Sequence, residues 1–285
     1  MNARYDFGRN WSGLAEGFEE EHLSQACADL RRLVGNLSGK TFLDIGCGSG
    51  LHSAAALRLG AASVTALDYD LGCVETTRAV LSKFAPNAEW SVGPGDVLAS
   101  ASLPSGAFDI VYSWGVLHHT GDMWTAIRNA AGFVGQGGKY AIAIYLKTPL
   151  CGLWTVEKRL YSSYRWLRPP VKALFVSAYL SARALRHRDA ISFMKNYRAR
   201  RGMEFLADVD DWLGGYPYQS TTAGELEAFV EKLGFRTGKR FNVNAGLGLF
   251  GTGCGEWCFE RNDLSLSHSD LATGKASTGQ AVGES

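Results

Sequence analysis

The sequence predicts an α/β fold in which a parallel β-sheet carries helices on both faces. Two observations indicate it. Short apolar runs alternate with helix-like segments between residues 40 and 145, and such alternation at short intervals is typical of parallel sheets. The first apolar run, FLDI, ends in the glycine turn GCGSG, a common link from a parallel strand to a helix. A chain of 285 residues, 46% of them hydrophobic, is long enough to bury one such domain with an insertion.

Each element of the first half follows from its residue pattern. Apolar residues at helical spacing predict a helix over 18–34, with acids early and Arg late, as a helix dipole prefers. After it we expect strands at 40–45, 62–68, 89–92, 108–113 and 139–145, and helices between them at 51–59, 71–84 and 122–134.

The alternation stops after residue 146 and resumes near residue 222. Residues 147–216 are rich in Arg, Leu, Tyr and Trp and predict two or three helices, broken at Pro169–Pro170. A capping box then begins a helix over 222–233, and strands are expected at 236–243 and 256–260. We therefore expect an N-terminal helical segment over residues 1–35 and a core over 36–146, which continues over 222–261. Between the two parts of the core, residues 147–221 form a basic helical insertion or substrate lid, and the composition of the tail, 262–285, predicts disorder.

Charge is distributed unevenly along the chain. The net charge is +1, but residues 147–201 hold thirteen Lys or Arg and two acids, so this segment carries +11 and the remainder −10. Such separation predicts an anionic partner. The sequence has no apolar run of about 18 residues and begins without an apolar leader, so we expect a cytoplasmic protein with at most peripheral membrane contact. Six cysteines without CxxC spacing predict free thiols and no metal site.

Acids follow three successive strands at the edge where parallel sheets bind ligands. Asp44 precedes the glycine turn 46–50, whose GxGxG spacing differs from the GxGxxG of dinucleotide enzymes. Asp68 ends the second strand, where an acid can accept hydrogen bonds from two ribose hydroxyls. Asp96 follows the third strand, where a carboxylate can accept from an adenine amino group. A structural turn and loop-capping acids would explain each feature singly, but together they favour a nucleoside-containing cofactor.

Together these motifs resemble the class I S-adenosylmethionine-dependent methyltransferases. The matching segments are FLDIGCGSG, VTALDYD, GDVLAS, FDIVYSWGVLHH and GQGGKYAIAIY. The resemblance implies a doubly wound, seven-stranded, mostly parallel Rossmann-like sheet whose last strand is antiparallel, with S-adenosylmethionine as cofactor. It further implies that the glycine turn packs the methionine part, Asp68 binds the ribose and Asp96 the adenine. The implied cofactor-binding residues are Asp44, Gly46, Cys47, Gly48, Gly50, Asp68, Tyr69, Asp96, Val97, Ser113 and Trp114.

Two histidines after the fourth strand are candidate general bases. Methyl transfer from a sulfonium needs a base only when the acceptor must lose a proton, and histidine is the side chain best matched to proton transfer near neutral pH. We predict that His119 is this base, because it is nearer the loop, with His118 as the second candidate. The alternative is that one of the two packs structurally beneath the cofactor.

The absence of several known motifs narrows the class of molecule that could accept the methyl group. No NPPY, DPPY or Pro-Cys follows the fourth strand, which disfavours methylation of DNA bases or glutamine. No RNA-binding module accompanies the basic segment, so nucleic acid is disfavoured. We expect methylation of an oxygen, nitrogen or carbon of a small metabolite, such as a sugar, a quinone or a lipid-linked intermediate. The expected substrate contacts are Trp11, Arg183 and Tyr216. The alternatives are a non-catalytic cofactor-binding module and a nucleotide-cofactor oxidoreductase, and the oligomeric state stays open.

The segment 171–186 predicts a helix with two different faces. One face has four apolar residues and the other three bases, namely Val171, Leu174, Ala178 and Leu185 against Lys172, Arg183 and Arg186. The simplest interpretation is a helix that docks its apolar face on the core and leaves the bases in water. Alternatively, the bases bind a phosphorylated or carboxylated substrate, or the surface rests on anionic lipid.

Overall fold

The structure is a computed structural model that describes residues 15, 17–99, 103–187, 190–195, 197 and 205–262. The predicted substrate contact Trp11 and the tail beyond residue 262 lie outside these residues.

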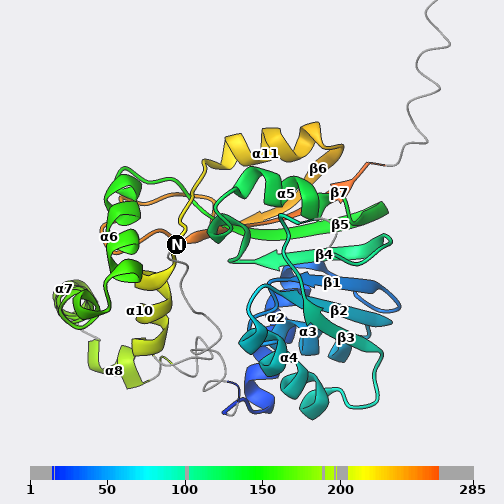
Figure 1. Ribbon diagram of the computed structural model, residues 1–285, viewed down its shortest axis with the longest axis horizontal. Helices are drawn as coiled ribbons and strands as arrows, with labels where there is room; N and C mark the ends of the chain where they lie inside the picture. The colour runs from blue at the N-terminus through cyan, green and yellow to red at the C-terminus, as the bar shows by residue number, and fades with distance from the viewer. Residues whose placement is uncertain are drawn as a thin grey trace, which may run out of the picture.

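Seven strands form one sheet in the order β3-β2-β1-β4-β5-β7-β6 (Figure 1). The strands are β1 Thr41–Ile45, β2 Ser63–Asp68, β3 Trp90–Pro94, β4 Phe108–Trp114, β5 Val134–Tyr145, β6 Phe235–Phe241 and β7 Cys254–Arg261. Strands β1 to β5 run parallel to one another, and β7, which lies between β5 and β6, is antiparallel to both. The doubly wound, mostly parallel, seven-stranded sheet that the sequence predicts is confirmed.

Helices cover both faces of this sheet. On one face lie α2 Glu20–Val34, α3 Leu51–Arg58 and α4 Leu71–Phe84, and on the other α5 Met123–Ala131 and α11 Ala223–Lys232. Successive strand residues alternate between the two cores, as Phe42 and Leu43 of β1 show by packing on opposite sides. Both side chains are fully buried, so the sheet positions its carboxyl edge rigidly.

The fifth strand is longer than predicted and the helix before it shorter. Helix α5 ends at Ala131, and the chain enters the sheet at Val134, which pairs with Phe108 before the register shifts to Lys139 opposite Ile110. The glycines of the segment VGQGG belong to an irregular first part of β5.

The insertion forms a helical lobe beside the sheet (Figure 1). Its described elements are α6 Cys151–Ser163, the 3-10 turn η3 Arg165–Leu167, α7 Arg168–His187, α8 Ala190–Lys195 and α10 Phe205–Gly214. The sequence predicted that Pro169–Pro170 breaks a helix, and this is wrong. Both prolines lie in the first turn of α7, where the backbone N–H that proline lacks would have no helical partner.

Helix α7 docks through a different face from the one the sequence predicted. Leu174 and Leu185 are 73% and 85% exposed, whereas Phe175 and Tyr179 pack on the small core of the lobe. The prediction that the aliphatic face docks is wrong because aromatic side chains, which bury more area, make the contact. Val171 alone of the predicted apolar face packs against that core.

Two of the three bases expected in water, Lys172 and Arg183, contact other residues of the lobe. Lys172 Nζ lies 2.6 Å from Asp210 Oδ2 of α10, and the guanidinium of Arg183 stacks 3.8 Å from the ring centroid of Phe193. Asp210 lies just beyond the segment 147–201, so part of the predicted +11 charge is compensated inside the lobe.

Candidate functional site

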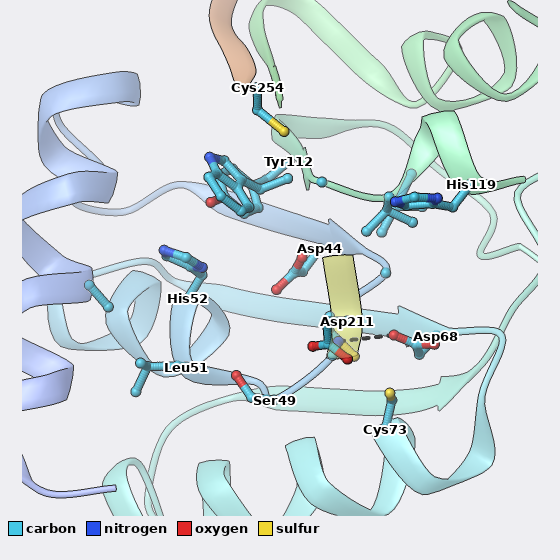
Figure 2. A pocket seen from close by; sticks show the side chains of 18 of the residues that line it. Asp44, Ser49, Leu51, His52, Asp68, Cys73, Tyr112, His119, Asp211 and Cys254 are labelled. Atoms are coloured by element: carbon cyan, nitrogen blue, oxygen red, sulfur yellow. Dashed lines mark hydrogen bonds between the residues drawn. The ribbon is translucent and has the colours of Figure 1, made fainter. Parts of the chain in front are cut away.

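A cavity of about 1070 Å³ opens at the carboxyl edge of the parallel strands (Figure 2). Its walls come from the ends of β1, β2, β4 and β5, the loop after β3, and the helices α2 and α10. This volume is at the upper end of the range for small-molecule sites, so the cavity has room for a cofactor and a second small molecule.

The glycine turn forms the floor of the cavity. Gly46, Gly48 and Gly50 have φ values of 78°, 54° and 77°, in the left-handed region that favours glycine. A Cβ on Gly46 would lie 2.4 Å from the Val116 side chain, and one on Gly50 would lie 2.7 Å from the Thr77 Cα. Gly46 and Gly48 line the cavity, whereas Gly50 does not and serves to pack the turn on α4.

Asp68 connects the second strand to this turn. One carboxylate oxygen accepts the Gly48 N–H at 2.9 Å and the other accepts the Asp70 N–H at 2.9 Å. Burial raises the pKa of Asp68, although the backbone donors oppose this shift. Each oxygen keeps capacity for a further donor, and the side chain faces the cavity, as Figure 2 shows.

The third strand brings Asp96 and Val97 to the same cavity, and Tyr69 lies beside them with 59% of its surface exposed. Asp96 Oδ1 accepts the Leu98 N–H at 2.9 Å. The three strand ends therefore meet around one space, as expected from the sequence.

Asp44 is the most deeply buried acid at the site. It is 2% exposed, and Ser53 Oγ donates to its Oδ2 at 2.6 Å. Burial raises the pKa of Asp44 from 3.8 to about 7, and the neighbouring Asp68 adds to this shift. Figure 2 shows Asp44, Asp68 and Asp211 directed into the same space.

Asp44→Asn should stabilise the ligand-free protein more at high pH than at low pH. Because the folded-state pKa is raised from 3.8 to about 7, the stability of the wild type falls as pH rises through this window and stays low above it. Asn is neutral and can still accept from Ser53, so the gain should reach about 4 kcal/mol at pH 8 and be smaller at pH 5. Thermal denaturation of the wild type and the variant at pH 5 and pH 8 measures the gain in stability. An equal rise in Tm at both pH values would contradict a raised pKa of Asp44.

His119 reaches the cavity from η2 Leu117–His119. Its Nδ1 lies 2.7 Å from the Pro217 carbonyl oxygen, and because a carbonyl only accepts, Nδ1 carries the proton. Nε2 is then the basic nitrogen of the neutral ring. A Cβ on Gly215 would fall 2.6 Å from Cε1 of His119, so a residue without a side chain is required there. No local pattern marks Gly215 or Pro217 as neighbours of His119, because they lie almost a hundred residues away in the chain.

His118 lies outside the cavity lining. It is fully buried, and among the described residues neither ring nitrogen has a hydrogen-bond partner. Its ring packs 4.0 Å from that of Tyr145 and 4.3 Å from that of His119, measured between centroids. Burial, with smaller contributions from His119 and Lys158, holds its pKa well below the usual range. Of the two predicted bases, His119 alone lines the cavity, and His118 has the packing position of the alternative interpretation.

The remaining predicted residues divide between the cavity and other places. Cys47 and Trp114 line it, but Ser113 is fully buried and donates from Oγ to the Ile45 carbonyl at 2.8 Å. Neither Arg183 nor Tyr216 is among the lining residues. The structure therefore does not bring these two expected substrate contacts to the site.

A polar network that the sequence did not reveal forms another wall. Glu256 of β7 is 7% exposed and accepts from Trp114 Nε1 at 2.9 Å and from Arg32 Nη2 at 2.6 Å. Arg32 comes from α2, more than 200 residues earlier in the chain, so no local pattern marks the pair.

The cavity is acidic. Nine lining residues carry a carboxyl group, and Arg32 is the one Lys or Arg among the lining residues that the structure describes. The carboxyl groups belong to Glu21, Asp29, Asp44, Asp68, Asp70, Asp96, Asp208, Asp211 and Glu256. The described bases of residues 147–201 do not line it, so the insertion contributes acids of α10 to this space.

Comparison with known proteins agrees with this architecture. Residues 42–138 match the family model for a methyltransferase domain. An uncharacterised methyltransferase of Mycobacterium bovis is 37% identical over 119 residues, which are 41% of this chain and 57% of that protein. A ubiquinone biosynthesis O-methyltransferase of Xanthomonas euvesicatoria is 35% identical over 113 residues, 40% of this chain and 46% of that protein. The chain thus spans about half the length of these relatives.

Two solved structures share the fold. Magnesium protoporphyrin IX methyltransferase from Synechocystis, with bound S-adenosylhomocysteine, aligns with a TM-score of 0.51 at 17% identity, covering 85% of this chain and 84% of that one. An S-adenosylmethionine-dependent methyltransferase from Mesorhizobium loti aligns with a TM-score of 0.51 at 17% identity, covering 84% of this chain and all of that one. The methyltransferase-domain match over residues 42–138 and the seven-stranded sheet support the resemblance to the class I S-adenosylmethionine-dependent methyltransferases that the motifs indicated.

Proposed function

We propose that the cavity binds S-adenosylmethionine, with the adenosine part against Asp68 and Asp96 and the methionine part over the glycine turn. The fit rests on the close backbone approach at Gly46, where a Cβ would clash with Val116, and on the carboxylates after β2 and β3. The acidic lining suits a ligand with a positive sulfur and a positive amino group. When bound, this cofactor supplies a methyl group that an acceptor atom takes by direct displacement.

The acceptor that we propose is a hydroxyl group of a neutral small molecule. The observation that carries this proposal is the hydrogen bond from His119 Nδ1 to the Pro217 carbonyl, because it presents Nε2 as a base in a wall of the cavity. A base assists when an oxygen acceptor must lose its proton. The acidic lining disfavours the phosphorylated or carboxylated substrate that the charge pattern suggested. The name of the ubiquinone relatives supports a hydroxylated quinol as a first acceptor class to test.

The residues around His119 hold and shield it. The Pro217 carbonyl fixes the ring orientation and stabilises the imidazolium that forms when Nε2 takes the hydroxyl proton. The Tyr145 ring meets the His119 ring edge-on at 5.4 Å and helps keep water from the reacting atoms. His119 then releases the proton to solvent after the methyl ether has left.

A transfer assay with methyl-labelled S-adenosylmethionine tests this function. The purified protein is incubated with a short-chain hydroxyquinol, a catechol and a primary amine, and the products are separated by chromatography. We expect label on a hydroxyl oxygen. Label on the amine instead would contradict the choice of oxygen, and cofactor binding without any transfer to these acceptors or to a total metabolite extract would indicate a non-catalytic binding module.

A further inference from the structure

The solvent-facing side of α7 is apolar where a helix in water is normally charged. Figure 1 shows α7 at the outer edge of the helical lobe. We define the outer stripe as the exposed residues Trp166, Pro170, Leu174, Ala178, Ser181 and Leu185. The last five recur every three or four positions and so share one helix face. From residue 170 to residue 185 this face runs about 22 Å without a charged side chain.

The apolar residues of the outer stripe are strongly exposed. Trp166 is 73%, Leu174 73% and Leu185 85% exposed. Single exposed apolar residues are common, but a continuous exposed apolar surface marks an interaction site. No helix among the described residues has the length and hydropathy to cross a bilayer, so an interaction of this helix with lipid would be confined to the membrane surface.

Positive charge flanks the outer stripe at both ends. Arg165 and Arg186 are exposed and adjoin Trp166 and Leu185 in the sequence. Arg186 lies on the neighbouring face of α7, so its long side chain must extend past Leu185 to reach the headgroups. Among the described residues from 147 to 197, the one acid is Glu157, and both of its carboxylate oxygens are buried. An apolar face with bases and without exposed acids has the composition of a helix that lies in the headgroup region of an anionic membrane.

The distribution of charge around the outer stripe also disfavours a dimer formed through this face. In a symmetric dimer the same patch meets itself, so Arg165 and Arg186 would approach the like charges of a second copy, and the described residues of 147–197 offer them no exposed acid. Anionic headgroups supply that complement, because each base near such a surface gains binding energy.

We propose that the outer stripe docks this protein on the surface of an anionic lipid bilayer, with the apolar residues at the headgroup boundary and the flanking arginines on lipid phosphates. Helix α10, which packs against the inner side of α7 through Phe205 and Val209, also contributes Asp211 and Trp212 to the cavity. In the described part of the chain, only helix α10 therefore separates α7 from this wall of the cavity. If the proposed function holds, this arrangement lets the enzyme take its acceptor from the membrane.

Vesicle flotation tests the docking. Wild-type protein should float with vesicles of phosphatidylcholine and phosphatidylglycerol at 7:3, bind pure phosphatidylcholine much more weakly, and lose binding as salt is raised. The double variant Leu174→Gln/Leu185→Gln should partition at least about tenfold more weakly. The double variant Arg165→Gln/Arg186→Gln should lose roughly fivefold for each base.

The matched control is Leu247→Gln/Leu249→Gln, because these leucines are 70% and 61% exposed but lie in the loop between β6 and β7. It should float like the wild type. Calorimetric titration with S-adenosylhomocysteine on each variant separates loss of docking from loss of the fold or of the cofactor site. Absence of wild-type flotation, or equal flotation of Leu174→Gln/Leu185→Gln, would overturn the proposal. A wild-type dimer that this variant converts to monomer would assign the outer stripe to a second copy instead.

Discussion

His119→Gln should lose about 10²–10⁴-fold in turnover of a hydroxyl acceptor while its affinity for S-adenosylhomocysteine stays within about twofold. Gln is a neutral polar side chain without a basic nitrogen, so the variant removes the base while the position stays polar. What is lost is the ring nitrogen Nε2, which accepts the hydroxyl proton in the proposed function. Initial rates with labelled S-adenosylmethionine, together with calorimetry, measure the two quantities.

The control for this variant is His118→Phe. Both ring nitrogens of His118 are buried without partners among the described residues, so an apolar ring of similar shape should be accepted, with turnover kept within about tenfold. If His119→Gln turns over normally and His118→Phe does not, the assignment of the base is reversed. If both turn over normally, methyl transfer here needs alignment alone.

Asp68→Ala should weaken binding of S-adenosylmethionine by at least about tenfold. Two hydrogen bonds from ribose hydroxyls to a charged acceptor contribute about 1.5–3 kcal/mol each when buried. The same substitution also removes the acceptor of the Gly48 N–H and so loosens the glycine turn. Calorimetric titration gives the change in dissociation constant.

The matched control is Glu75→Ala, since Glu75 is an acid of the same region whose side chain is exposed and paired with Arg78 within α4. It should bind the cofactor as the wild type does. Equal affinities for wild type and Asp68→Ala would show that the adenosine part does not rest on the end of β2.

The sheet could be predicted from sequence because each of its elements is encoded locally. Strand β2 and helix α4 have near the predicted bounds, since a buried strand and a capped amphipathic helix are set by residues close together in the chain. The family resemblance added the antiparallel direction of the last strand, which no local pattern contains. The glycine turn and Asp68 could also be predicted, because each is marked by residues close together in the chain. The turn needs glycines at positive φ, and Asp68 ends a short apolar strand.

The contacts that complete the site are not local, and these the sequence could not predict. The orientation of His119 depends on Pro217, and the wall at Trp114 depends on Glu256. The face by which α7 docks depends on which neighbour it meets, so its amphipathic pattern alone pointed to the wrong side. Part of the excess positive charge is balanced by an acid outside the basic segment, because Asp210 follows that segment in sequence but pairs with Lys172 in space.

A crystal structure with S-adenosylhomocysteine tests the central claim most directly. The account predicts that the ligand lies in the cavity with its ribose hydroxyls on Asp68, its adenine beside Asp96 and its sulfur facing the wall that holds His119. A ligand bound elsewhere, or one whose sulfur faces away from His119, would contradict it.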